Sequence, residues 1–163
     1  MLVKSVPDTT AEELCKLPPG GNVLVSPAMG PGFPIESIAD AKQIYLVCTG
    51  SGLAPIKSLI ESNALKGETR QTMTLLYGIH SKEHNPLNDQ QIAHWQSDFN
   101  INPVFVYSED GDGYVQDELK RHKENIDGAN TGACFCGQKE MVQDAKAVLS
   151  EAGVHDEKML LNF

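Results

Sequence analysis

Residues 48–58 read CTGSGLAPIKS, and this stretch decides the fold class. It follows an apolar run at residues 44–47 and precedes a segment in which Ile56, Leu59 and Ile60 have helical spacing. A strand is therefore expected to end at a glycine pair that opens a helix. Glycine lets the backbone approach a ligand closely, and the free N–H groups of a first helical turn attract anions. The stretch predicts a phosphate-binding turn, and Pro55 suits the first turn of its helix.

Apolar runs of strand length alternate with helix-length segments along the rest of the chain. The expected strands are residues 44–48, 73–77, 104–107, 133–136 and 159–161. The expected helices between them are residues 53–64, 88–99, 115–123 and 139–152. This alternation predicts an α/β fold, a five-stranded parallel sheet with helices on both faces. Ligands of such sheets bind beyond the carboxyl ends of the strands.

Glycine, a small hydroxyl residue or both follow each of the first four expected strands. The four segments read TGSG at 49–52, GIHS at 78–81, SEDG at 108–111 and CGQ at 136–138. Glycine at one strand end is common, but its recurrence at all four ends is more specific. The pattern indicates a binding site at the carboxyl edge of the sheet.

The acidic pair Glu109-Asp110 has two interpretations. A carboxylate near an adenosine ribose accepts hydrogen bonds from its hydroxyls and repels a ribose phosphate. If this loop meets the adenosine end of a cofactor, NADH is favoured over NADPH. Alternatively, the sequence EDGDG at 109–113 forms a solvated acidic turn with no ligand, since it is favourable turn chemistry.

Length and charge narrow the function classes. The chain has 163 residues, enough for one domain with a core, and a formal net charge of −9, which argues against nucleic acid as a partner.

No apolar run approaches the roughly 20 residues of a membrane span, and no secretory signal is recognisable. The cysteines, Cys15, Cys48, Cys134 and Cys136, form no CxxC pair, so we expect reduced thiols in an intracellular protein. The histidines show no zinc-site spacing, and no metal is expected.

The first 38 residues differ from the rest of the chain. They contain six of the nine prolines. We expect a short helix at residues 10–17, a short strand at 22–26 and a Gly/Pro loop at 27–34. This is too little for an independent core, so residues 39–163 are expected to form the principal domain.

Four segments resemble, in order, motifs of the ferredoxin–NADP reductase family. Residues 48–58 resemble its T-G-x-G-x-A-P signature, which an aliphatic or aromatic residue and Arg/Lys-Ser follow. Residues 76–80 (LYGIH), 114–117 (YVQD) and 136–141 (CGQKEM) resemble three later motifs. The likeness is greatest to plant- and algal-type members. It implies an NAD(P)-binding domain at residues 39–163, preceded at residues 1–38 by a remnant of a flavin-binding β-barrel.

The resemblance implies roles for individual residues. Cys136 would lie near the nicotinamide and Phe163 would cover the flavin ring, and these are the expected catalytic residues. Thr10 would begin a helix that faces the flavin pyrophosphate. The other expected cofactor-binding residues are Thr49, Gly50, Ser51, Gly52, Ala54, Pro55, Gly78, His80, Ser108, Glu109, Gly137 and Met141. The alternative interpretations are a buried strand thiol for Cys136 and an ordinary apolar chain end for Phe163.

The implied activity is that of a flavin-dependent oxidoreductase. Hydride would pass from NAD(P)H, with NADH preferred, to FAD and then to an electron-acceptor protein. Two features depart from the family: its Arg-x-Tyr/Phe-Ser/Thr flavin motif is absent, and NADP-specific members have Ser-Arg where this chain has Ser108-Glu109. The alternative is a truncated nucleotide-binding or interaction module without turnover of its own. The plant-like resemblance suggests the plastid or the cytoplasm as the location.

Overall fold

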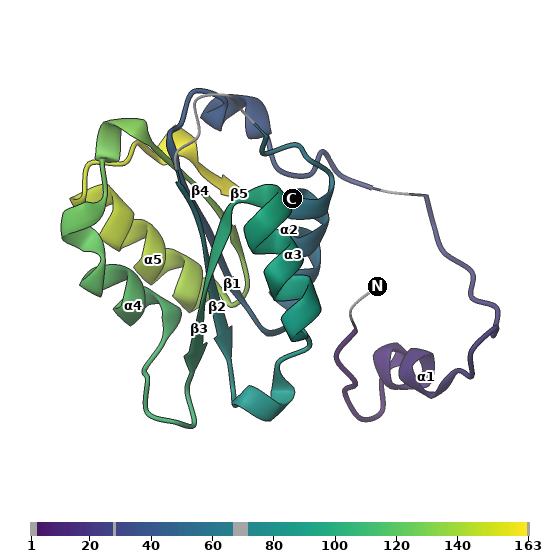
Figure 1. The fold of residues 1–163 in the computed structure, drawn as a ribbon. Coiled ribbons are helices and arrows are strands. Elements are labelled where there is room, and N and C mark those ends of the chain that lie inside the picture. Colours follow the sequence, from purple (N-terminus) through teal and green to yellow (C-terminus); the bar gives the residue numbers. More distant parts are fainter. Residues whose placement is uncertain (1–2, 28, 67–71, 163) are drawn as a thin grey trace.

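Five parallel strands form one sheet in the computed structural model, which describes residues 3–27, 29–66 and 72–162 (Figure 1). The strands are β1 (Gln43–Thr49), β2 (Thr72–Ile79), β3 (Ile101–Tyr107), β4 (Thr131–Cys136) and β5 (Met159–Leu161). Their order is β3-β2-β1-β4-β5, and every neighbouring pair is parallel. The predicted five-stranded parallel sheet is confirmed.

Helices cover both faces of this sheet, as the alternation predicted. They are α2 (Leu53–Glu61), α3 (Asp89–Phe99), α4 (Val115–Arg121) and α5 (Lys139–Glu151). Figure 1 shows α2 and α3 on one face and α4 and α5 on the other. None of the helices that the structure describes is long and apolar enough to cross a membrane.

Each face of the sheet has its own hydrophobic core, because side chains alternate along a strand. Leu46 and Tyr77 point towards α2 and α3, where they pack in one cluster with Ile56 and Trp95. Val47 and Leu76 belong to the second cluster, which α4 and α5 cover; its other members include Phe135, Ala145 and Leu149. The two cores hold the strands in register, so their carboxyl ends meet at one edge.

Two element boundaries differ from the sequence expectation for local reasons. Helix α2 ends at Glu61 rather than at residue 64, because Asn63 adopts a left-handed conformation with φ of 61°. Strand β3 begins at Ile101 rather than at residue 104, although Pro103 lies within it. A proline is tolerated there because β3 is an edge strand, where one N–H group faces away from the sheet.

Most of the N-terminal arm, residues 3–27 and 29–32, extends away from the sheet (Figure 1). Its helix α1 (Thr10–Lys16) contains no buried residue. The strand expected at residues 22–26 is wrong: this segment pairs with no strand among the described residues, and Val23, Leu24 and Val25 are exposed. Local β-propensity cannot form a strand without a partner that accepts its backbone hydrogen bonds.

Packing against the sheet begins before residue 39. The short 3-10 helix η1 (Ile35–Ile38) places Ile38 in the core, where it is fully buried. A Cβ on Gly132 of β4 would lie 2.6 Å from the Ile38 Cγ2 atom. The domain boundary between residues 38 and 39 stays a prediction, and Ile38 itself packs with the sheet.

Candidate functional site

A cleft of about 760 Å³ lies at the carboxyl edge of the sheet. Its walls come from the residues that follow β1, β2 and β4, from the end of β3, and from the first turns of α4 and α5. This volume is in the range of small-molecule sites, roughly 300–1,000 Å³. The predicted position of the site, beyond the strand ends, is where the structure has its cleft.

Ten of the predicted site residues line this cleft. They are Thr49, Gly50, Ser51, Gly52, Gly78, His80, Ser108, Cys136, Gly137 and Met141. Four predicted residues do not: Ala54 faces a second cavity beside α3, Pro55 lies within α2, Glu109 lies just outside the lining, and Thr10 lies on the distant arm. Phe163 lies outside the described residues.

The turns after β1 and β4 pack so closely that side chains are excluded from them. A Cβ on Gly52 would lie 2.1 Å from the Cys136 carbonyl oxygen. A Cβ on Gly137 would lie 2.3 Å from Thr49 Oγ1 and 2.6 Å from the Met141 Cε atom. Real Cβ atoms are essentially never this close to backbone atoms, so position 52 requires glycine. At position 137 the Thr49 and Met141 side chains would have to shift to admit a Cβ atom. The backbone contact of Gly52 with Cys136 and Gly137 forms the floor of the cleft.

The start of α2 offers backbone N–H groups to the cleft. Gly50–Gly52 forms a 3-10 turn, and within the described residues no side chain caps either this turn or α2. The Tyr77 hydroxyl donates a hydrogen bond to the Gly50 carbonyl oxygen at 3.0 Å and holds the turn against β2. Uncapped N–H groups at a helix start attract an anion such as a phosphate.

The Cys136 side chain is half-buried at the end of β4 and pairs in register with Cys48 of β1. Burial raises the pKa of the Cys136 thiol. Burial and the neighbouring Cys136 raise the pKa of Cys48 well above its usual value. Both thiols are therefore neutral near pH 7, and Cys136 presents the cleft with an uncharged wall rather than a nucleophile.

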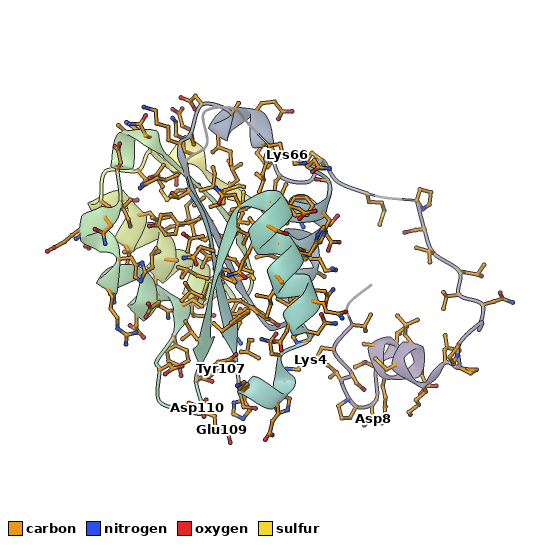
Figure 2. The ribbon with its side chains drawn as sticks, in the orientation of Figure 1. Lys4, Asp8, Lys66, Tyr107, Glu109 and Asp110 are labelled. Atoms are coloured by element: carbon orange, nitrogen blue, oxygen red, sulfur yellow. The ribbon has the colours of Figure 1, made fainter. Side chains whose placement is uncertain are left out.

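The opposite end of the cleft carries a polar cluster at the ends of β2 and β3. The Glu109 N–H donates to the His80 carbonyl oxygen at 2.9 Å, and His80 Nε2 lies 3.7 Å from Glu109 Oε2. Ser108 donates from its backbone to the Ile79 carbonyl oxygen at 3.1 Å. These hydrogen bonds keep His80, Ser108 and Glu109 together at the rim. Glu109 and the neighbouring Asp110 lie at this end of the sheet in Figure 2.

Five further polar residues line the cleft without having been assigned a role from the sequence: Lys4, Tyr114, Gln116, Gln138 and Glu140. Gln116 is distinctive, because its Oε1 atom is buried and has no hydrogen-bond partner among the described residues. Its Nε2 atom is 3.4 Å from Asp144 Oδ2. A buried acceptor without a donor costs roughly 1–3 kcal/mol, which a ligand N–H or O–H would recover. The motif at residues 114–117 was the signal that pointed to this segment.

Lys4 is the sole lysine or arginine among the described residues that line the cleft. Figure 2 shows it on the N-terminal arm, at the same end of the sheet as Tyr107 and Glu109. An anion in this cleft would therefore be held mainly by backbone N–H groups. No group of three or more His, Cys, Asp or Glu side chains in the described part of the chain is arranged to hold a metal ion.

The glycine floor, the uncapped helix start and the unsatisfied Gln116 oxygen suit an extended ligand with a central phosphate group. These features at the carboxyl edge of a parallel sheet define a nucleotide-binding α/β domain. A family model described as "Oxidoreductase NAD-binding domain" matches residues 46–147. The chain belongs to this family, as the nucleotide-binding domain of the ferredoxin–NADP reductase type, which confirms the resemblance of its motifs.

Curated relatives span more than this chain. "Fruit protein pKIWI502" of Actinidia deliciosa is 32% identical over 98% of this chain and 52% of its own length. "NADPH-dependent diflavin oxidoreductase 1" of Candida albicans is 34% identical over 53% of this chain and 15% of its own length. The chain thus spans about half of the first relative and a smaller share of the second.

Solved structures share the fold. A ferredoxin NADP+ reductase from Neisseria gonorrhoeae with bound FAD and NADP aligns with a TM-score of 0.63 at 23% identity, over 77% of this chain and 57% of that one. The CS-b5R domains of human Ncb5or in the NAD+ form align with a TM-score of 0.69 at 14% identity, over 99% of this chain and 48% of that one. The fold expected from the sequence is confirmed.

Proposed function

We propose that this chain is the NAD(P)H-binding module of a flavin-dependent oxidoreductase. In this activity, hydride passes from NADH to FAD, and electrons then pass to an electron-acceptor protein. The observation that carries the proposal is the cleft itself, with the Gly52 and Gly137 floor beside the uncapped start of α2. A dinucleotide would place its pyrophosphate at that helix start.

The two ends of the cleft suit the two halves of a dinucleotide. We assign the nicotinamide to the β1–β4 side, where Thr49, Cys136 and Met141 line the wall. The adenosine then extends towards the ends of β2 and β3. There Tyr114 offers an exposed ring for stacking, and the buried Gln116 oxygen offers an acceptor for an amino or hydroxyl group.

The protein contributes placement in this proposal, and the cofactors contribute the redox chemistry, with nicotinamide as hydride donor and flavin as acceptor. The neutral Cys136 thiol and the Met141 side chain, which is 4% exposed, form an apolar wall that keeps water from the reacting ring. The Gln138 N–H donates to Thr49 Oγ1 at 3.4 Å and holds that side chain at the turn between β1 and α2.

Glu109 supports the preference for NADH. Its side chain is 58% exposed at the rim, beside Ser108, which lines the cleft. A carboxylate here accepts hydrogen bonds from ribose hydroxyls and repels a phosphate on the same ribose. The alternative interpretation, an acidic turn without a ligand, is consistent with the Tyr107 N–H donating to Asp112 Oδ2 at 3.1 Å, which folds the loop on itself.

The substitution Glu109→Arg tests this preference. We expect NADPH to gain about tenfold in affinity relative to NADH, because a repulsive charge becomes a phosphate ligand. Calorimetric titration of the full chain with each dinucleotide measures the ratio. Asp110→Arg is the matched control, since it makes the same charge change one residue farther along the loop. Equal gains from both variants would show that overall charge, not Glu109, sets the ratio.

Flavin binding is the part of the proposal that depends most on the N-terminal arm. The alignment with the CS-b5R domains of human Ncb5or covers 99% of this chain, and by family resemblance Thr10 would begin a helix that faces the flavin. In the structure, however, Thr10 lies away from the cleft, and α1 buries no residue. The residues described here therefore fit the dinucleotide better than they fit the flavin.

An absorbance spectrum of the purified chain separates the enzyme from the module without turnover. Flavin absorbance that bleaches when NADH is added supports the oxidoreductase. A colourless protein that binds NADH and stays colourless with added FAD supports the nucleotide-binding module. No binding of either dinucleotide contradicts both. Location in the plastid or cytoplasm and the identity of the acceptor stay predictions from the sequence.

A further inference from the structure

His80 and Glu109 form an ionisable pair at the rim of the cleft. Their side chains come from the ends of neighbouring strands, β2 and β3, and the two are joined by the 2.9 Å backbone hydrogen bond and the 3.7 Å side-chain approach. His80 lines the cleft and its side chain is 67% exposed, so a ligand in the cleft can reach it. The pair therefore places a histidine, the residue type used most often as a switch near neutral pH, within reach of the ligand.

Other ionisable groups lie beside His80 or line the same cleft. The His84 ring of η3 (Lys82–His84) lies 5.7 Å from the His80 ring, and its Nδ1 atom is 2.7 Å from Ser81 Oγ. Lys4 of the N-terminal arm and Glu140 of α5 line the same cleft. Among these residue types, histidine is the one whose charge ordinarily changes near neutral pH.

Resting on the proposed function, we propose that His80 makes the choice between NADH and NADPH dependent on pH. With a neutral imidazole, Glu109 leaves a net negative rim, which repels the extra phosphate of NADPH. With a protonated imidazole, the His80–Glu109 pair is neutral overall and has a donor that can face a phosphate oxygen. The cleft then accepts NADPH more readily, while NADH, which lacks this phosphate, changes little.

The expected size of the effect follows from the interaction of one imidazolium charge with one phosphate at a solvent-exposed site. Such an interaction changes affinity by about three- to tenfold at physiological ionic strength. The 2′-phosphate itself titrates with a second pKa near 6, so the NADPH affinity can change with pH without any contribution from His80. A test must therefore measure how the NADPH affinity relative to NADH changes with pH. It must compare this change between the natural chain and a variant that lacks the imidazole.

The experiment is calorimetric titration of the full chain with NADH and with NADPH at about pH 6 and about pH 8, at constant ionic strength. In the natural chain, we expect the NADPH affinity relative to NADH to rise about three- to tenfold more on acidification than it does in His80→Gln. His80→Arg should favour NADPH at both pH values. His94→Gln is the matched control, because His94 is an exposed histidine beside Asp98 on α3, away from the cleft.

The outcomes separate this inference from the function on which it rests. If the NADPH affinity relative to NADH changes equally with pH in the natural chain and in His80→Gln, and NADH still binds, the role of His80 is overturned but the proposed function is not. A reduced change in His94→Gln that matches His80→Gln also overturns the role of His80, since the effect would then be general. Absence of NADH binding at both pH values overturns the proposed function and this inference together.

Discussion

Gln116 shows how a single residue can be placed to bind a ligand although this placement lowers the stability of the ligand-free protein. Its Oε1 atom is buried beside the cleft without a partner among the described residues, whereas its Nε2 atom reaches Asp144. Buried acceptors are nearly always satisfied in folded proteins. The exception coincides with the cleft, which is where a ligand donor would restore the missing hydrogen bond.

The substitution Gln116→Met tests this interpretation at the residue scale. Methionine has a similar length and removes the unsatisfied oxygen, so we expect the free energy of unfolding to stay equal or rise by about 1 kcal/mol. We expect NADH affinity to fall about tenfold, because the ligand loses its acceptor. Urea unfolding and calorimetric titration measure the two quantities.

Gln96→Met on the exposed face of α3 is the control for Gln116→Met. It should leave NADH affinity unchanged. An unchanged affinity in Gln116→Met as well would show that the buried oxygen has no contact with the dinucleotide.

At the scale of single elements, α3 is the helix whose boundaries are most clearly set by local chemistry. The Asn88 side chain accepts from the Gln91 N–H at 2.8 Å, and Gln91 Oε1 accepts in return from the Asn88 N–H at 3.5 Å. This is a capping box. The other end stops at Asn100, whose φ of 54° is left-handed. Between them, α3 contributes the fully buried Trp95 to the core.

We expect Asn88→Ala to lower the free energy of unfolding by about 1 kcal/mol, because the first turn of α3 loses its side-chain acceptor. NADH affinity should stay the same, since α3 does not line the cleft. Gln90→Ala changes an exposed residue in the same turn and should alter stability by less than about 0.5 kcal/mol. Equal losses in the two variants, measured by urea unfolding, would refute the role of the cap.

At the scale of the whole molecule, Tyr77 connects stability to pH. Its ring is 2% exposed in the core, and burial, with a smaller contribution from Cys48, raises its pKa from 10.0 to about 12. Between these two values the unfolded chain has released the phenol proton and the folded protein has kept it. The free energy of unfolding therefore falls as the pH rises above 10, and Tyr77 has no such effect at lower pH.

We expect this fall to reach about 1.4 kcal/mol per pH unit between about pH 10 and about pH 12. Urea unfolding at several pH values in this range measures the slope. Tyr77→Phe removes the titrating group and should flatten the slope, although it costs about 1 kcal/mol at neutral pH through the lost hydrogen bond to Gly50. Tyr45 and Cys48 titrate in both proteins, so an identical slope in the variant would contradict the assignment to Tyr77.

The local hydrophobic pattern predicted helices and strands well where the segment packs or pairs with the sheet. The apolar run before Thr49 became β1, and the spacing after Leu53 became α2, because both signals are carried by neighbouring residues. The same kind of signal failed at Val23–Val25, where no partner strand is available among the described residues. It also placed β3 too late, since the cost of Pro103 depends on its position at the sheet edge.

The sequence by itself determined the α/β class, the glycine-rich turn at residues 49–52 and the strand ends that carry the site, because these depend on periodicity and turn chemistry. Tertiary structure decided which residues contact this turn and which strand ends lie side by side. Only the β3-β2-β1-β4-β5 order brings Gly137 against Thr49, Gly52 against Cys136, and His80 beside Glu109. These contacts join residues far apart in the chain, so they arise from how the strands pair and pack, which no local pattern encodes.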